Sequence, residues 1–452
     1  MDRTTDSIVS FILDLSEKKI SSHTMHQTKM RLMDALACAL GGLNSPPALI
    51  ACRLAQQIQS KAPAQVWGSG QASSMEMAAF ANAVMVRYLD YNDTYISKGS
   101  GHPSDMIAGL IAVAQAERCS GSALLVATVV AYEVFTALAD VIGIRDLGWD
   151  QGFFVVLGAT AGVSKLMNLN REQTADALAI AVSANLPTRQ TRSGQLSMWK
   201  GVATAWSVRA AISACLLAKE GMSGPTAAFE GRHGVFDQIT GPFELQLGAK
   251  ADFGIDRTAI KFFPSEYHSQ APLAMALELR KEVPWSHIAE IQVQTYYTAY
   301  SEIGSELEKW HPTTRETADH SLPYLLSLAL VDARIDQDSF TMEKMKDPVL
   351  VDLMSRIKIS ENKDFTAAYP HQLITQIDIV DKRGARFTKT AHYPKGHEKN
   401  PMTDEQIEWK FAMLADALMP TQQKAALLTE IKALDDRKSI DDLMRRMVFE
   451  SR

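Results

Sequence analysis

Polar side chains capable of acid–base chemistry are concentrated in residues 89–112, LDYNDTYISKGSGHPSDMIAGLIA, directly before an apolar run. Asp90 and Thr94 are four residues apart and would share one helix face if the preceding helix continued for another turn. His102 precedes a Pro-Ser-Asp sequence typical of a helix start, where free N–H groups and the dipole favour an anion such as a carboxylate. An aspartate near a histidine can also fix the imidazole tautomer for proton transfer. A polar loop that only caps helices would use the same residue types, so both interpretations stay open.

A second group, NLPTRQTRSGQLSMWKG at residues 185–201, places three cations between two Ala-rich helical stretches. Arg192 and Lys200 suit a polycarboxylate, because arginine binds a carboxylate through a bidentate fork and lysine binds it as a point charge. A solvated basic loop is the alternative interpretation.

Two further groups follow where the sequence pattern changes. Lys261 and His268 flank a Phe-Phe-Pro sequence at an expected domain junction, where clefts tend to form. They are candidate anion ligands, and an exposed junction explains them equally well. The fourth group lies directly before an apolar helix and contains Arg315, Asp319, His320 and Tyr324. Asp319 or Ser321 can simply cap that helix, and a histidine at such a border is more often structural than catalytic.

Several classes of chemistry lose support. The sequence contains no GxGxxG at a strand–helix junction, P-loop, GxSxG or HExxH motif, which argues against nucleotide binding and zinc hydrolysis. The four cysteines have no metal-ligand spacing and are expected to be buried hydrophobes in a reducing compartment. The net charge is −6 without a basic block, which argues against nucleic acid or a membrane as the main partner. Cofactor-free acid–base chemistry on a small anion remains.

The elements that must position these residues are mostly helices. Up to about residue 250 the apolar residues recur at helical spacing, and several Ala-rich stretches are apolar nearly all round, as in helices buried inside a helical domain. One of these helices begins with a cap near Asn170. Strand-like segments then appear at residues 289–300 and in a hairpin pattern around Lys-Arg-Gly at residues 382–384, with a helical pattern at residues 348–359 between them. Residues 403–406 have the pattern of a capping box that starts a C-terminal helix. We predict a mainly α protein: an all-α domain of residues 1–255 and 400–452, with an α+β lid domain of residues 256–399 inserted.

The cellular compartment is predicted from the N-terminus, MDRTTDSIVSFILDLSEKK, which is charged and amphipathic and lacks the apolar core of a secretory signal. The longest apolar stretch is interrupted by Glu133 and Asp140 and favours a core helix over a membrane span. We expect a cytoplasmic protein, or one of an organelle matrix.

Taken together, the polar segments resemble the MmgE/PrpD superfamily, which includes 2-methylcitrate dehydratase, cis-aconitate decarboxylase and iminodisuccinate epimerase. The segments that carry the resemblance are spread over the chain in family order: LDYNDT…GHPSD (89–105), RSGQLSMWKG (192–201), KFFPSEYHSQ (261–270), TRETADHSLPY (314–324) and YPKGHEKNPMTDEQI (393–407). The resemblance implies a helical domain and a lid domain, a homodimer, an active site in the cleft between the domains, and no need for a metal or organic cofactor.

The resemblance also implies site residues. The family's acid–base and binding residues fall on Asp90, Thr94, His102, Lys200 and Lys261, and further ones on His268 and Tyr324. Many members carry another active-site histidine in the stretch equivalent to residues 147–162. Here that stretch has none, and Gln151 or Phe154 takes the corresponding place. Glutamine can hydrogen-bond a substrate but cannot carry a proton at neutral pH.

The resulting hypothesis is a hydro-lyase acting on a hydroxylated di- or tricarboxylate, 2-methylcitrate or a relative. His102, oriented by Asp90, would transfer the proton, and Thr94 would hydrogen-bond the substrate. The expected ligands of substrate carboxylates and of the developing enolate-like charge are Lys200, Lys261 and Arg192. A decarboxylase or an epimerase with the same fold is a rival, as is a non-catalytic carboxylate-binding protein.

Overall fold

The computed structural model describes residues 1–249 and 252–449, and it divides into two compact units. Unit 1 contains residues 1–191, 201–258 and 403–452, and unit 2 contains residues 192–200 and 259–402. The predicted mainly α fold is confirmed: helices dominate, and extended structure is confined to two small sheets.

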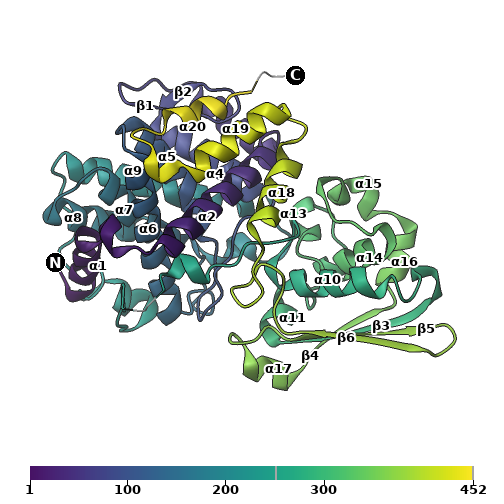
Figure 1. Ribbon diagram of the computed structural model, residues 1–452. Helices are drawn as coiled ribbons and strands as arrows, with labels where there is room; N and C mark the ends of the chain where they lie inside the picture. Colours follow the sequence, from purple (N-terminus) through teal and green to yellow (C-terminus); the bar gives the residue numbers. More distant parts are fainter. Residues whose placement is uncertain (250–251, 450–452) are drawn as a thin grey trace. The chain divides into compact units, whose positions relative to one another are not determined.

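Unit 1 is built from helices around a buried apolar centre, and both ends of the chain contribute to it (Figure 1). Its elements are α1 (Arg3–Asp14), α2 (Ser22–Gly42), α3 (Pro46–Ala55), β1 (Pro63–Gln65), β2 (Ala72–Ser74), α4 (Met75–Tyr88), α5 (Ile107–Ala116), α6 (Gly121–Val141), α7 (Gly152–Leu166), α8 (Arg171–Ala184), α9 (Ala203–Lys219), α18 (Asp404–Ala415), α19 (Thr421–Lys432) and α20 (Asp441–Arg446). The predicted capping box at Thr403 is confirmed at the start of α18. The cap predicted near Asn170 is confirmed at the start of α8, where Asn170 forms a capping box with Gln173. The late helix α18 packs against the early helix α2.

Helices α6 and α7 form the closest pair in the centre of unit 1. Gly158 and Gly162 on α7 permit this approach, since a Cβ at these positions would lie 2.7 and 2.9 Å from carbonyl oxygens of Ala131 and Ala127 on α6. α6 is long and apolar enough to span a membrane, but 89% of its apolar window is buried inside the protein, as expected for a core helix.

Unit 2 contains a four-stranded sheet with helices packed on it (Figure 1). Its elements are α10 (Gln270–Leu279), β3 (Ile288–Thr295), α11 (Tyr297–Ile303), α12 (Leu307–Trp310), α13 (Arg315–Ala318), α14 (Leu322–Asp332), α15 (Met342–Met345), α16 (Pro348–Met354), β4 (Ile357–Glu361), α17 (Lys363–Ala368), β5 (Thr375–Asp381) and β6 (Arg386–Ala391). The strand order is β4-β3-β5-β6, with β3 and β4 parallel and the other neighbours antiparallel. The apolar sides of β3 and β5 form a core with α10 and α14, and the predicted β5–β6 hairpin is confirmed.

The structure corrects the expected elements in three places. Residues 192–200, assigned from the sequence to the helical domain, pack with unit 2, where Leu196 hydrogen-bonds through its main chain to the side chains of Thr314 and Thr317. The helix expected through residue 359 ends at Met354, because the alternating residues 357–361 pair with β3. The strand expected over residues 289–300 ends at Thr295, and α11 follows.

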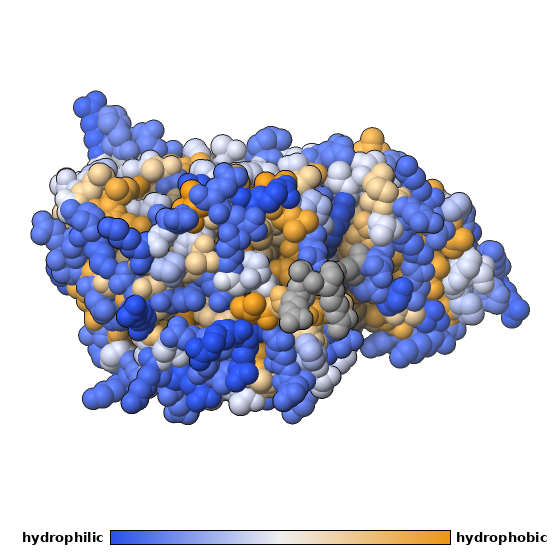
Figure 2. Space-filling view, turned by 90° about the horizontal axis from the view of Figure 1, so that it is seen from above, coloured by the Kyte–Doolittle hydropathy of each residue, from blue (hydrophilic) through white to orange (hydrophobic). Residues whose placement is uncertain are grey.

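The four cysteines are free thiols. Cys38 and Cys215 are buried as expected, and burial raises the pKa of Cys215 to about 12. Cys52 and Cys119 are partly exposed, contrary to the expectation. The face seen in Figure 2 is mostly hydrophilic, with apolar residues in small groups, as is normal for a globular protein.

Candidate active site

The first cluster of functional side chains begins where α4 ends. The extra helical turn that would put Asp90 and Thr94 on one face does not form: α4 stops at Tyr88, and Asp90 adopts a left-handed backbone with φ of 50°. Aspartate tolerates this conformation better than most residues. The turn places the buried Asp90 carboxylate in an ion pair with the equally buried Arg87, three residues earlier. Asp90 is therefore a fixed negative charge, and it does not share a helix face with Thr94.

His102 has a defined tautomer. Its Nδ1 lies 2.7 Å from the main-chain oxygen of Asp93 and 3.1 Å from Oγ1 of Thr94. A carbonyl oxygen can only accept, so Nδ1 carries the proton in the neutral ring and Nε2 keeps its lone pair. Nε2 lies 3.8 Å from Oδ1 of Asp90. The Asp93 carbonyl thus fixes the tautomer, the role expected of Asp90, and Asp90 can stabilise the imidazolium form through its charge.

The anion site expected at the helix N-terminus is already filled by the protein. A 3₁₀ turn of Pro103–Met106 leads into α5. The N–H of His102 donates to Oε1 of Gln151 at 2.6 Å, and the N–H of Ser104 donates to Oδ1 of Asp93 at 2.9 Å. A buried helix start must satisfy its donors internally, which is the physical reason for this arrangement. Gln151, predicted to bind substrate, uses its side-chain oxygen to hold the backbone of His102.

Asp93 is completely buried, and burial raises its pKa to about 6 in spite of hydrogen bonds from Ser104 and Tyr132 and the charge of Arg31. The folded protein therefore keeps a proton on this group at pH values where the unfolded chain has lost it. Stability from this group is complete below the ordinary value of 3.8 and is lost as the pH rises through about 6.

An Asp93→Asn variant should reveal this loss. As the pH rises from about 4 to 7, the free energy of unfolding of wild type should fall by about 3 kcal/mol more than that of the variant. This figure is the pKa difference of Asp93 between the folded and unfolded states, multiplied by about 1.4 kcal/mol per pKa unit. Urea unfolding at several pH values measures the difference. Any constant cost of placing an amide beside Tyr132 cancels in the comparison, and parallel curves for the two proteins would contradict the prediction.

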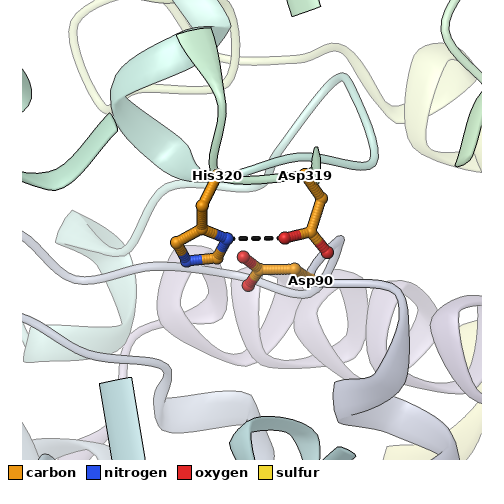
Figure 3. Close-up of side chains that lie close together, drawn as sticks. All are labelled: Asp90, Asp319 and His320. Carbon is orange, nitrogen blue, oxygen red and sulfur yellow. Dashed lines mark hydrogen bonds and ion pairs between the residues drawn. The ribbon is translucent and has the colours of Figure 1, made fainter. Parts of the chain in front are cut away.

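The second cluster surrounds a buried carboxylate in unit 2. Nζ of Lys200 lies 3.3 and 3.5 Å from the oxygens of Asp319, and Nη1 of Arg315 lies 3.1 Å from Oδ2. Nδ1 of His320 lies 2.5 Å from Oδ1 of Asp319 (Figure 3). Burial raises the pKa of Asp319, but Lys200, His320 and Arg315 outweigh it and hold the pKa below its usual range. One carboxylate thus organises two cations and an imidazole.

The remaining predicted residues are placed differently. Lys261 is buried, and Arg192 is partly exposed at the end of a 3₁₀ turn. His268 is buried, and its Nδ1 lies 2.5 Å from the hydroxyl oxygen of Tyr296. The main-chain N–H of His268 donates to the carboxylate of Glu266. Tyr324 lies in the apolar core of unit 2, where its hydroxyl donates to the carbonyl of Ser339, an arrangement that favours a structural role over the predicted substrate contact.

Sequence reasoning undervalued several residues of these clusters. Local patterns make Asp319 or Ser321 a helix cap and His320 a structural histidine. Ser321 is the cap of α14, whereas Asp319 faces Lys200, Arg315 and His320. The sequence patterns do not single out Arg87, Asp93 or Tyr132. An Asp-His pair next to an arginine was a usable signal. Its connection to Lys200, 119 residues away, was not readable from local patterns.

The loop of residues 393–401 holds the backbone next to Lys261. The N–H of Ile260 donates to the carbonyl of Gly396 at 3.1 Å, and Gly396 has a φ of 92°. A Cβ on Gly396 would lie 1.7 Å from the carbonyl oxygen of Ile260, so any side chain must displace the segment that carries Lys261.

A Gly396→Ala variant is expected to lower the free energy of unfolding by more than about 2 kcal/mol, since the contact adds to a left-handed backbone cost of about 1–2 kcal/mol. Gly384→Ala is the matched control, with a φ of 85° and nothing within 4 Å of the added Cβ. Urea unfolding compares the two variants. Equal losses would show that the approach to Ile260 imposes no constraint.

Two family models and several known proteins match this chain. The MmgE/PrpD N-terminal domain matches residues 6–248, and the MmgE/PrpD C-terminal domain matches residues 263–436. A mitochondrial 2-methylcitrate dehydratase of Yarrowia lipolytica is 27% identical, covering 87% of this chain and 81% of the relative. A 2-methylcitrate dehydratase of Escherichia coli is 26% identical, covering 94% and 93%. A cis-aconitate decarboxylase of Homo sapiens is 24% identical, covering 96% and 92%. The chain belongs to the MmgE/PrpD family.

Proposed function

We propose that the protein is a hydro-lyase that removes water from a hydroxylated di- or tricarboxylate, 2-methylcitrate or a close relative. The family and its named relatives, which are dehydratases and a decarboxylase, make the protein a lyase. The substrate is the more specific part of the proposal.

The observation that carries the proposal is the fixed tautomer of His102, which leaves Nε2 with a lone pair beside the charge of Asp90. Nε2 would take the α-proton of the substrate, and the electron pair of the broken C–H bond would form the C=C bond as the hydroxyl leaves. The imidazolium would then return the proton to the leaving hydroxyl, which departs as water. Asp90 would stabilise the imidazolium in between, and Thr94 would hydrogen-bond the substrate.

The cations proposed for the substrate's carboxylates are Lys200, Lys261 and Arg192. Negative charge spreads onto a carboxylate when the α-proton is removed, and fixed cations there stabilise the transition state more than the ground state. The contacts of Asp319 support this role for Lys200, because they hold its ammonium group in one place inside unit 2.

A decarboxylase is the second candidate, supported by the human cis-aconitate decarboxylase that aligns with 96% of this chain. Loss of CO₂ also leaves a carbanion, which the same cations would stabilise and the protonated His102 would quench. The two reactions differ in their products, so they can be separated directly.

The test is a screen of the purified protein with 2-methylcitrate, citrate, cis-aconitate and iminodisuccinate. Absorbance of the new alkene and mass spectrometry should show loss of water from 2-methylcitrate or citrate. Release of CO₂ from cis-aconitate would establish the decarboxylase instead. Deuterium uptake from solvent with inversion would indicate an epimerase, and binding without turnover of any of the four acids would contradict a catalytic function.

A further inference from the structure

Tyr132 contacts the proton-transfer cluster from an element that the proposed mechanism does not use. It lies in the middle of α6, is completely buried, and donates its hydroxyl to Oδ2 of Asp93 at 2.7 Å. The surrounding sequence, ATVVAYEVFTAL, is mostly apolar, with buried Thr128, Glu133 and Thr136 as its other polar residues. The carboxylate of Glu133 accepts from the N–H groups of Gly248 and Gly254, so it is held away from Asp93.

Asp93 connects Tyr132 to His102 in two ways. Its main-chain oxygen accepts the Nδ1–H of the imidazole, and its Oδ1 accepts the N–H of Ser104, two residues beyond His102. One residue thus holds both the ring and the backbone that follows it. If the carboxylate of Asp93 moved, the N–H of Ser104 would lose its acceptor, and the backbone that carries His102 could shift relative to the Asp93 carbonyl that determines the tautomer.

The surroundings make the contact with Tyr132 difficult to replace. Both side chains are fully buried, so water cannot take the place of the hydroxyl without opening the core. The charges facing this pair come from Arg31 and Asp34 of α2. Since Arg31 donates to the carbonyl of Thr258 and to Gln27, it is oriented by groups other than Asp93. The Tyr132 hydroxyl donates to Oδ2 of Asp93, and Ser104 holds the same carboxylate through its side chain and its main-chain N–H.

We propose that Tyr132 is a positioning residue for proton transfer: by holding Asp93, it keeps the His102 imidazole in the Nδ1–H tautomer, in which the lone pair of the neutral ring is on Nε2. The inference rests on the proposed function only in assigning proton transfer to His102. The tautomer itself is a property of the resting protein and can be measured without substrate.

The test is Tyr132→Phe, which removes one hydroxyl and keeps the ring that packs in the core. With 2-methylcitrate as substrate, we expect kcat to fall by roughly 10- to 100-fold, the scale of misplacing a reacting group by about 1 Å, and KM to stay within about twofold. Nitrogen-15 NMR of the histidine rings, assigned by difference from His102→Gln, should show Nδ1–H in wild type and a mixture of tautomers in the variant.

Tyr95→Phe is the matched control. Tyr95 lies in the loop that carries Asp93 and His102, and its hydroxyl is hydrogen-bonded to Asp140 and Arg257 rather than to Asp93. It should lose similar thermal stability and keep both the tautomer of His102 and kcat. Equal loss of kcat in both variants would reduce Tyr132 to general support of the loop and overturn the inference.

Two outcomes separate this inference from the proposed function. The inference is overturned, whatever the substrate, if the resting wild-type enzyme carries the His102 proton on Nε2 or if the tautomer is unchanged in Tyr132→Phe. The wild-type measurement does not depend on the folding of any variant. Full activity of His102→Gln would instead overturn the proposed function, while the NMR result would still test the link from Tyr132 to the ring.

Discussion

His102→Gln is expected to lower kcat for dehydration by about 10²–10⁴, the usual contribution of a proton-transfer residue. Glutamine can still donate an amide N–H to the carbonyl of Asp93, 2.7 Å from Nδ1 in wild type, so the loop should keep its conformation. What disappears is the basic nitrogen beside Asp90. KM should change little, because the loss falls on the chemical step, and steady-state kinetics with 2-methylcitrate measure both constants.

The control for this variant is His26→Gln. His26 also faces an aspartate, with Nε2 3.1 Å from Asp404, but its side chain is 41% exposed on α2 and takes no part in the proposed site. Its kcat should match that of wild type. A His102→Gln enzyme that folds normally and turns over at the wild-type rate would contradict the assignment of His102 as the base.

The helices of unit 1 could be predicted because their signals are local. Apolar spacing and caps within 10–20 residues located α2, which ends at Gly42, and α8, which begins with the capping box at Asn170. The β5–β6 hairpin was equally readable from two alternating runs around one turn. Segments whose structure depends on distant partners were assigned wrongly. Residues 357–361 have the sequence pattern of a helix end. They form strand β4 because they pair in parallel with β3, which lies about 60 residues earlier in the chain.

The same limit applies to the candidate site. The polar segments themselves stood out by composition, and His102 was identified within one of them. The partner that fixes its tautomer is a main-chain carbonyl, which no residue type reveals. Tyr132 lies in a mostly apolar segment that has the pattern of a core helix, so its contact with Asp93 cannot be recognised from the sequence. Asp319 has the sequence position of a helix cap, and only the folded chain shows its contact with Lys200. Residue types therefore indicated the chemistry, and tertiary contacts decided the roles.

Asp319→Asn is expected to lower the free energy of unfolding of unit 2 by about 3–5 kcal/mol, the cost of leaving buried charge without its partner. The carboxylate is 0% exposed and serves Lys200, Arg315 and His320 together. An amide of the same shape keeps the volume but leaves the buried ammonium and the guanidinium without the counter-charge. Because the pKa of Asp319 is held below its ordinary value, its stabilisation is complete above that value and is lost only as the pH falls below it.

Lys200→Met separates the structural effect from the effect on the substrate. It removes the proposed carboxylate ligand but leaves Asp319 with Arg315 and His320, so its cost in stability should be much smaller than that of Asp319→Asn. Its KM for 2-methylcitrate should rise and its kcat should fall, since a lost cation weakens both ground-state binding and stabilisation of the developing charge. The double variant should recover part of the stability lost in Asp319→Asn, because the buried ammonium that faced the carboxylate of Asp319 is also removed, and should recover none of the activity. Urea unfolding and steady-state kinetics of the three variants measure these effects. Equal destabilisation by the two single changes would contradict a carboxylate shared among three partners, and an unchanged KM in Lys200→Met would place the substrate's carboxylate elsewhere.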